Sequence, residues 1–250
     1  MQTNIVVSVD ENIDSLFTAV FELFGRTDIA AVTSRAEVQM SLCSEHITLS
    51  ADAEKAGRIR TAARRLLGDF GMQEVFDAYR SGHGSREKVI FDYLTMLFKE
   101  GKNSVKNLAR AEVVAFKEIL ERVRHESHLM RGFVRFMRAQ SGIYYAEIAP
   151  DNNVLDMVMP FFCRRFNDMR FVVHDSRRGL LGIYDGKRHS VVKSSLPVQA
   201  LIGEDERNLQ RLFKQYYRSI SIPERKNLRL MRRFMPVRYH RYMPEKDELL

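Results

Sequence analysis

The first half of the chain shows both strand-like and helical patterns of apolar residues. Residues 4–9, NIVVSV, form a β-branched run, and residues 15–25, SLFTAVFELFG, repeat apolar side chains at helical spacing. A second strand-like run, EHITLS, precedes a helical pattern over residues 52–71. From about residue 73 to residue 130 the pattern is helical, with an apolar stripe that begins at Val105 and Leu108. We therefore predict an N-terminal strand-helix-strand followed by central helices.

The pattern changes after Gly132. Two strand-like runs, FVRFMRA and IYYAEIA, are joined by a short QSG connection. Residues 151–166 then have helical periodicity, with Asp151 as the expected N-cap and Pro160 expected to kink or split the helix. Three short strands follow, MRFVVHD, LLGIYDG and HSVVKSS, with turns between them. This order predicts a mostly antiparallel β-β-α-β-β-β unit and, after it, a C-terminal basic helical segment.

These elements place the chain in the α+β class, and we expect a single α+β domain over residues 1–250. With 45% hydrophobic residues, a chain of this length can bury a sizeable core. The pattern also allows a subdivision into a mainly helical half, residues 1–125, and a half with the sheet and the basic C-terminal segment, residues 126–250.

The net charge of +8 is concentrated near the C-terminus. Residues 225–244 contain seven basic residues and no acid, which leaves only +1 for the rest of the chain. Such a local patch favours a phosphate backbone, an anionic lipid or an acidic partner protein. The seven residues are Arg225, Lys226, Arg229, Arg232, Arg233, Arg238 and Arg241.

Cysteine usage and apolar runs exclude several classes of protein. Cys43 and Cys163 stand 120 positions apart, as expected of reduced thiols rather than of a disulfide framework. The absence of a CxxC pair argues against a zinc ribbon or an iron–sulfur cluster. No signal-peptide pattern and no run long enough for a membrane span is present. We expect a cytoplasmic protein with no membrane association, no metal and no cofactor.

The C-terminal stretch ERKNLRLMRRFMPVRYHRYMPE combines charge with helical register. Its arginines at 225, 229, 232 and 233 share one ridge of a helix, which we expect to dock by its apolar side. After Pro236, basic and aromatic residues alternate, a pattern that suits phosphates and base stacking. Either this segment binds nucleic acid, or it is a basic helix that binds nothing.

Acid and base candidates lie elsewhere in the second half. His125 and His128 are three positions apart near a helix end, too few ligands by themselves for a metal site. His174 and Asp175 are neighbours at a strand end and point to opposite faces of the strand, so they do not form a dyad by themselves. An acid/base site would need a shared cleft. Whether the chain is an enzyme stays open at this point, and the catalytic candidates are Glu126, His128, Asp151, His174 and Asp175.

Three long stretches carry a resemblance to a known family: ESHLMRGFVRF, IYYAEIAPDNNVLDMVMPFFCRRFNDMRFVVHDSRRGLLGIYD and LFKQYYRSISIPERKNLRLMRRFMPVRYHRYMPE. Over residues 126–245 the chain resembles the bacterial family described as probable DNA metabolism proteins, a domain of unknown function. The resemblance implies association with a radical-SAM protein that carries helix-hairpin-helix elements. Some members are fused to a uracil-DNA-glycosylase-like domain. The matching polar positions are Glu126, His128, Arg135, Asp151, Arg165, Asp175, Arg178, Arg225, Arg238 and Tyr239.

Three functions are compatible with these observations. The first is a DNA-binding accessory protein in bacterial DNA metabolism or repair, which acts with a separate radical-SAM or glycosylase-type enzyme. The second is an enzyme that acts on a nucleic acid base or sugar, and the third is a scaffold for an acidic partner protein. For the first, the expected nucleic-acid-binding residues are Arg135, Arg225, Arg229, Arg232, Arg233, Arg238, Tyr239 and Arg241.

Overall fold

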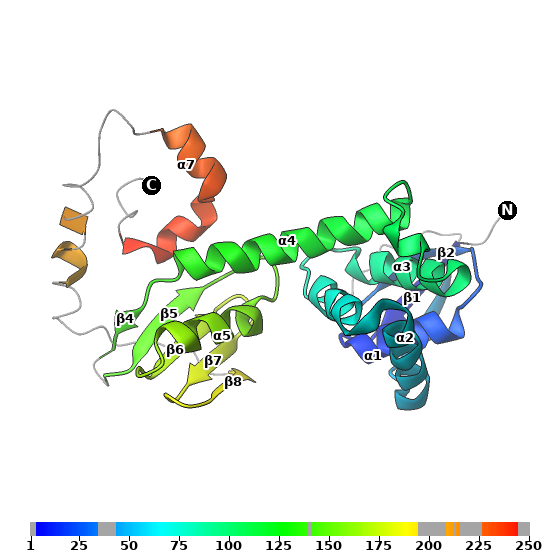
Figure 1. Cartoon of the computed structure of the whole chain (residues 1–250), viewed down its shortest axis with the longest axis horizontal. Helices are drawn as coiled ribbons and strands as arrows, with labels where there is room; N and C mark the ends of the chain where they lie inside the picture. Colours follow the sequence, from blue (N-terminus) through cyan, green and yellow to red (C-terminus); the bar gives the residue numbers. More distant parts are fainter. Residues whose placement is uncertain are drawn as a thin grey trace. The chain divides into compact units, whose positions relative to one another are not determined.

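In the computed structural model, the β-branched residues near the start of the chain form the middle strand of a parallel sheet (Figure 1). Strand β1 (Asn4–Val9) pairs in parallel with β2 (Ile29–Thr33) on one side and with β3 (Ser44–Leu49) on the other. Parallel neighbours need a crossover, and helix α1 (Ile13–Glu22) lies in the connection between β1 and β2. The sequence predicts β1, α1 and β3 but not β2, because the run IAAVT is short and contains two alanines.

The structure describes residues 4–34, 44–139, 142–194, 209–212, 214–215 and 227–244. The chain divides into two compact units, Met1–His125 and Glu126–Leu250. Both contain helices and a sheet, so the predicted α+β class and the predicted order of elements are confirmed. A single domain over the whole chain stays a prediction.

The helices of the first unit begin and end at residues suited to those positions. Asn12 caps α1 by accepting a hydrogen bond from the backbone N–H of Ser15 at 2.8 Å. Helix α2 (Ala53–Tyr79) loses helical geometry at Gly68, where φ is 74°, in the left-handed region that favours glycine. Helix α3 (Arg86–Glu100) is the third helix of this unit.

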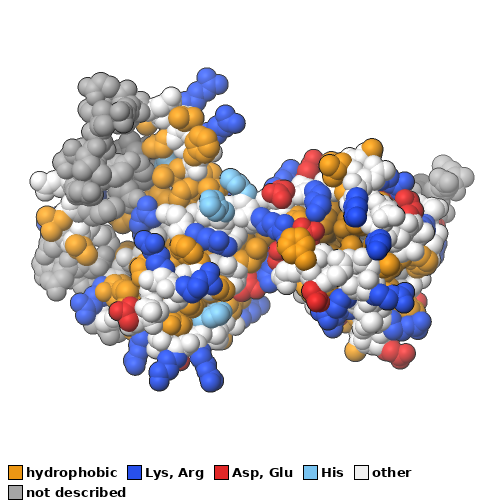
Figure 2. Space-filling view, viewed as in Figure 1, with side chains coloured by type: hydrophobic (Ala, Val, Ile, Leu, Met, Phe, Trp, Pro, Cys, Tyr) orange, Lys and Arg blue, Asp and Glu red, His pale blue; other side chains and the backbone are white. Residues whose placement is uncertain are grey.

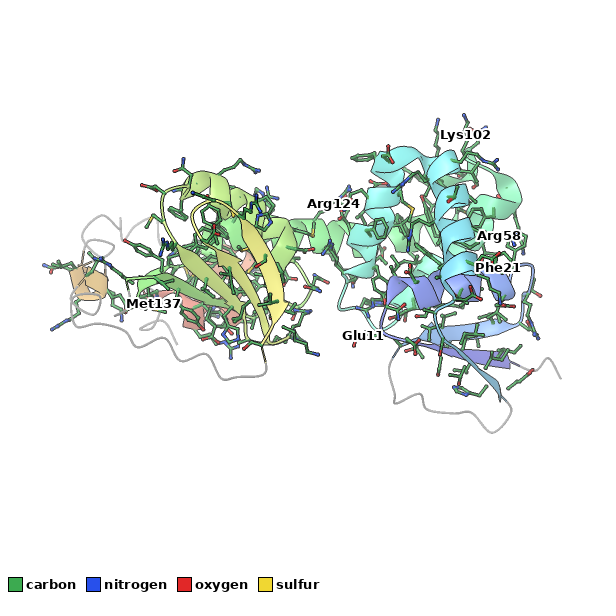
Figure 3. The ribbon with its side chains drawn as sticks, turned by 90° about the horizontal axis from the view of Figure 1, so that it is seen from below. Glu11, Phe21, Arg58, Lys102, Arg124 and Met137 are labelled. Carbon is green, nitrogen blue, oxygen red and sulfur yellow. The ribbon has the colours of Figure 1, made fainter. Side chains whose placement is uncertain are left out.

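These helices pack with the parallel sheet to form one core. Figure 3 labels Phe21 of α1 and Arg58 of α2, whose guanidinium carbon lies 4.7 Å from the centre of the Phe21 ring. Such stacking places a charged residue over an aromatic side chain while the charge remains near solvent. The largest fully buried side chains of this unit are Ile5, Leu16, Phe17, Met72, Ile90, Phe91, Leu94, Leu97 and Phe116.

The predicted apolar stripe from Val105 is wrong at its start. A short 3-10 helix, η1 (Ser104–Lys106), comes first, and helix α4 begins only later (Ala111–Phe133). The side-chain oxygen of Asn107 accepts a hydrogen bond from the backbone N–H of Ala109, a turn that competes with helix formation. Leu108, which the stripe would bury, is 70% exposed.

The sheet of the second unit confirms the predicted β-β-α-β-β-β order. Its strands lie in the order β4-β5-β6-β7-β8, and only β5 and β6 run parallel. The connection between these two strands contains α5, as parallel pairing requires. The bounds are β4 (Met137–Arg138), β5 (Tyr144–Ile148), α5 (Leu155–Arg165), β6 (Phe171–Asp175), β7 (Leu180–Tyr184) and β8 (His189–Lys193).

Helix α5 differs from its prediction in two ways. Pro160 does not split it, since the helix continues from Leu155 to Arg165. Asp151 is not its N-cap, because the cap position belongs to Val154. The helix packs closely on β7, where a Cβ atom at Gly182 would lie 2.5 Å from the sulfur of Met159. Only glycine fits this approach without a shift of its neighbours.

The C-terminal segment is helical, as predicted, over α7 (Leu228–Phe234) and the 3-10 helix η3 (Val237–Tyr242). The expected docking of α7 by its apolar side is wrong, since none of its residues is buried. Arg225 and Cys43 lie outside the described residues. Among the described helices, none has both the length and the apolar character needed to cross a membrane.

Candidate functional site

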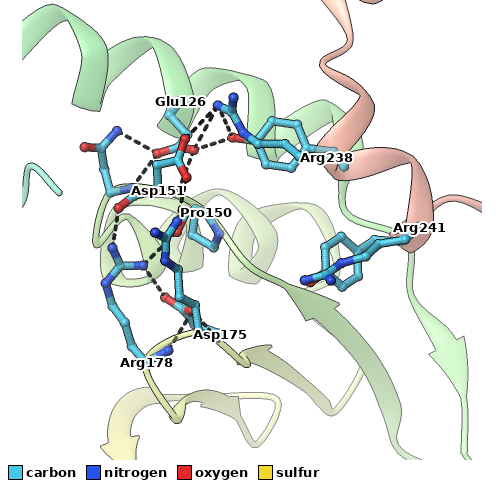
Figure 4. Close-up of polar contacts among 11 residues, drawn as sticks. Glu126, Pro150, Asp151, Asp175, Arg178, Arg238 and Arg241 are labelled. Atoms are coloured by element: carbon cyan, nitrogen blue, oxygen red, sulfur yellow. Dashed lines mark hydrogen bonds and ion pairs between the residues drawn. The ribbon is translucent and has the colours of Figure 1, made fainter. Parts of the chain in front are cut away.

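Several predicted site residues meet around one buried carboxylate, that of Glu126 on α4 (Figure 4). One of its oxygens accepts hydrogen bonds from the backbone N–H of Asp151, at 2.8 Å, and from the hydroxyl of Tyr239. The other accepts from the backbone N–H of Asn152 at 2.7 Å and from the side-chain amide of the same residue at 2.6 Å. Four donors thus satisfy a carboxylate that is only 3% exposed.

A second carboxylate, that of Asp175, closes the turn after β6. It accepts hydrogen bonds from the backbone N–H groups of Arg177 and Arg178, at 3.1 and 3.2 Å. The Arg178 guanidinium pairs with it at 3.1 Å and donates to the backbone carbonyls of Pro150 and Asp151. Asp175 is fully buried. Because Arg178 bridges the two loops, the carboxylate also fixes the chain before α5.

The carboxylate of Asp151 remains half exposed between two arginines. One of its oxygens pairs with Arg177 at 2.5 Å and the other with Arg238 at 3.2 Å. Arg238 also lies 3.6 Å from Glu126 and donates a hydrogen bond to the Tyr239 hydroxyl at 2.9 Å. The loop before α5 and the C-terminal segment therefore meet in one network of charges.

Tyr239 anchors the C-terminal segment within the second unit. It is 2% exposed and donates its hydroxyl hydrogen to Glu126. Burial, followed by the hydrogen bond to Glu126, raises the pKa of Tyr239 above its ordinary value of 10. The phenol therefore keeps its proton at neutral pH and acts as a donor to the carboxylate.

The five catalytic candidates are only partly brought together. Glu126, Asp151 and Asp175 belong to the network described above, and their oxygens are occupied by donors. His128 is exposed on α4. The ring of His174 is hydrogen-bonded at 2.8 Å to the hydroxyl of Tyr145 rather than to one of these carboxylates. Their catalytic roles stay a prediction.

Three members of the network were not among the predicted site residues, Asn152, Arg177 and Arg178. Asn152 directly follows the candidate Asp151, and Arg177 and Arg178 come two and three positions after the candidate Asp175. This proximity, together with the place of Arg178 among the polar positions that match the family, is the signal that the sequence offers. Within the described part of the chain, no three His, Cys, Asp or Glu side chains are grouped in a way that could hold a metal ion.

The predicted nucleic-acid-binding residues fall into two sets. Arg238 and Tyr239 are engaged with Glu126 and its neighbours, whereas Arg229, Arg232 and Arg233 are exposed on α7. The latter three form no ion pair with any described residue. Arg241 is also exposed, with its guanidinium over the ring of Tyr242 at 4.6 Å. Arg135 donates hydrogen bonds to the carbonyls of Gly132 and Val134 near the end of α4.

The charge excess of the chain belongs to the second unit as a whole. Residues 126–250 contain 23 Lys and Arg against 14 Asp and Glu, whereas residues 1–125 contain 17 against 18. On the face seen in Figure 2, blue basic side chains outnumber red acidic ones over the second unit. This unit therefore produces a positive field that attracts polyanions.

The comparisons with known proteins give one match, which covers the end of the first unit and most of the second. A family model described as a domain of unknown function, DUF4130, matches residues 84–245. No curated protein and no solved structure matches the chain.

Proposed function

The chain belongs to the DUF4130 family, a domain of unknown function, and we propose that it binds nucleic acid, DNA in particular, through the arginines of its second unit. The observation that carries the proposal is the set of exposed arginines on α7. Arg229, Arg232 and Arg233 have no acidic partner among the described residues. A guanidinium without an acidic neighbour keeps its donors for a phosphate, which it can bind in a bidentate manner.

The neighbouring η3 supports the proposal because it is fixed by a buried contact. Tyr239 reaches Glu126 across 113 positions of sequence, and Arg238 pairs with Asp151 beside it. A fixed segment loses less conformational entropy on binding than a free tail does. The anchor therefore suits a surface that presents Arg241 and the arginines of α7 to an extended polyanion.

The biological setting of the proposal rests on the resemblance described above. We place the protein in the bacterial cytoplasm, as an accessory in DNA metabolism or repair that acts with a separate radical-SAM or glycosylase-type enzyme. In this role the chain would hold DNA, and the partner would supply the chemistry. The proposal needs no catalytic residue in this chain.

The test is the salt dependence of DNA binding, measured for the unaltered protein and for the double variant Arg232→Ala/Arg233→Ala. The slope of log K against log salt concentration should become shallower by about 0.9 for each phosphate contact that is lost. Affinity at low salt should fall as well. Both changes follow because the variant removes exposed charges and no buried contact.

The matched control is Arg65→Ala/Arg122→Ala, which removes two exposed arginines from helices of the first unit. This control changes the net charge by the same amount as the α7 variant. If DNA binds to the second unit, the control should keep the salt slope of the unaltered protein. Identical slopes for all three proteins would contradict the role of α7. If the protein binds an acidic partner protein through the same arginines and does not bind DNA, the scaffold function is favoured instead.

A further inference from the structure

The second unit contains a pocket that the sequence does not reveal. It has a volume of about 490 Å³, within the ~300–1,000 Å³ of small-molecule sites. Its walls come from the end of α4 and the residues after it, from α5, and from the first residues of β5 and β6. The residues that define its chemistry are Arg131, Arg135, Phe136, Phe161, Arg165 and Phe166.

Aromatic rings form the apolar part of this pocket. Phe162 and Phe171 are buried, with 2% and 1% exposed, and Phe136 meets both edge to face at 5.3 and 5.2 Å between ring centres. Phe136, Phe161 and Phe166 are only partly buried. Phe162 and Phe171 therefore make the fixed interior of the pocket, while the three partly buried rings can contact a bound molecule.

Arginines lie over two of the partly buried rings, Phe161 and Phe166. The guanidinium carbon of Arg131 is 5.8 Å from the centre of the Phe161 ring, and that of Arg165 is 5.7 Å from the centre of the Phe166 ring. Both arginines are exposed and form no ion pair with a described residue. Flat cations and flat rings alternate in this way at sites where planar groups stack.

The charge of the pocket limits what it can bind. Among the described residues that line it, three are arginines and none is acidic. A purely apolar ligand would desolvate these cations without pairing them, which is unfavourable. An inorganic anion alone would leave the rings without a partner. The ligand that fits both features has a flat aromatic face and a negatively charged group beside it.

We propose that this pocket takes one unstacked base of a nucleic acid strand, with the adjacent phosphates on Arg131 and Arg165. The inference rests on the proposed function and adds to it a preference for single-stranded or locally opened nucleic acid. In a duplex the faces of a base are covered by its neighbours, and only an unpaired base can offer them to aromatic rings. Tyr144 also lines the pocket and adds a further aromatic side chain to it.

The experiment compares two DNA single strands of equal length, one with normal thymine bases and one in which every base is replaced by an abasic site. Both carry the same phosphates. The unaltered protein should bind the normal strand roughly 5- to 100-fold more tightly, the range that corresponds to stacking of one base. Phe161→Leu should remove most of this ratio and leave the salt slope unchanged, because leucine fills space but does not stack.

Arg232→Ala/Arg233→Ala is the matched control, and it should lower the salt slope while the ratio between the two strands persists. A second readout needs no variant. A strand that carries 5-iododeoxyuridine should photo-crosslink to a peptide that contains residues 161–166 or Tyr144.

The possible results separate the two proposals. If neither strand binds but a DNA duplex of the same length does, the base pocket is refuted and the proposed function stands. If the duplex does not bind either, the proposed function is refuted. If both strands bind equally, nucleic acid binding stands and the base pocket is refuted. The pocket is refuted also if Phe161→Leu, with an unaltered circular dichroism spectrum, keeps the full ratio, or if the crosslink lies outside the pocket.

Discussion

Replacement of Glu126 by glutamine tests whether this carboxylate holds the second unit together. Glutamine keeps the shape of the side chain but turns one acceptor oxygen into a donor nitrogen. Each oxygen of Glu126 accepts two hydrogen bonds, one of them from a backbone N–H, of Asp151 or of Asn152. The Tyr239 hydroxyl or the Asn152 amide can rotate to accept from the new nitrogen, but a backbone N–H cannot.

The expected loss of stability follows from this count. One backbone N–H is left without an acceptor, at a cost of about 1–3 kcal/mol. The two bonds to the remaining oxygen become neutral, and each loses roughly 1 kcal/mol, the difference between charged and neutral acceptors. Together these effects predict that Glu126→Gln lowers the free energy of unfolding by about 3–5 kcal/mol. Tyr239→Phe, which removes one donor and creates no new one, should cost less.

Urea unfolding measures the free energy, and amide hydrogen exchange shows where protection is lost. Exchange should accelerate in residues 237–242 and in the loop around Asp151, because both are held by Glu126. The control is Glu121→Gln, an exposed position on the same helix, which should change stability by less than about 0.5 kcal/mol. If Glu126→Gln is as stable as Glu121→Gln, the anchoring role assigned to Glu126 is wrong.

Two other predictions concern packing and pH. Gly182→Ala should lower the free energy of unfolding by about 1–3 kcal/mol, because the new Cβ would lie 2.5 Å from the Met159 sulfur. The control is Gly57→Ala on α2, which has open space around it and should be neutral or stabilising in the same urea assay. Burial raises the pKa of Tyr79, Tyr93 and Tyr145 to about 12, so these phenols stay protonated in the folded protein after the unfolded chain has released their protons. The contribution of these tyrosines to the free energy of unfolding should therefore be fully present below pH ~10 and be lost between pH ~10 and ~12. A titration followed by phenolate absorbance should show that some of the nine tyrosines ionise later than the others. A single transition near pH 10 with the fold intact would contradict this prediction.

Local pattern was sufficient for most of the elements. The β-branched run at residues 4–9 and the turns before Gly179 and at Gly186 follow from side-chain type, and both glycines have the positive φ that such turns use. The failures have a different origin. Asp151 has the chemistry of an N-cap, yet its backbone N–H is bound by Glu126, which lies 25 positions earlier in the sequence. A contact of that range overrides local preference, and no periodicity encodes it.

For the candidate site, the sequence indicated which residues take part but not the role of each one. The sequence singled out Glu126, Asp151, Asp175, Arg238 and Tyr239, and the structure brings all five into one network. The sequence does not show which of these carboxylates already accept as many hydrogen bonds as they can, because the donors come from distant parts of the chain. The pocket escaped detection because the apolar spacing of phenylalanines on α5 fits a buried helix face equally well.

The buried network and the exposed arginines make complementary contributions to binding. Affinity for a polyanion requires cations that solvent can reach, but exposed cations on a free tail must be ordered before they bind. In this protein Tyr239 and Arg238 are held by Glu126 and Asp151, and Arg241, in the same 3-10 helix, remains exposed. The buried Glu126 and the half-exposed Asp151 thus fix the position of a basic surface without neutralising Arg241 or the arginines of α7. A chain of nearly the same composition but without Glu126 would keep its positive electrostatic field. It would lose the fixed position of the arginines in the C-terminal segment.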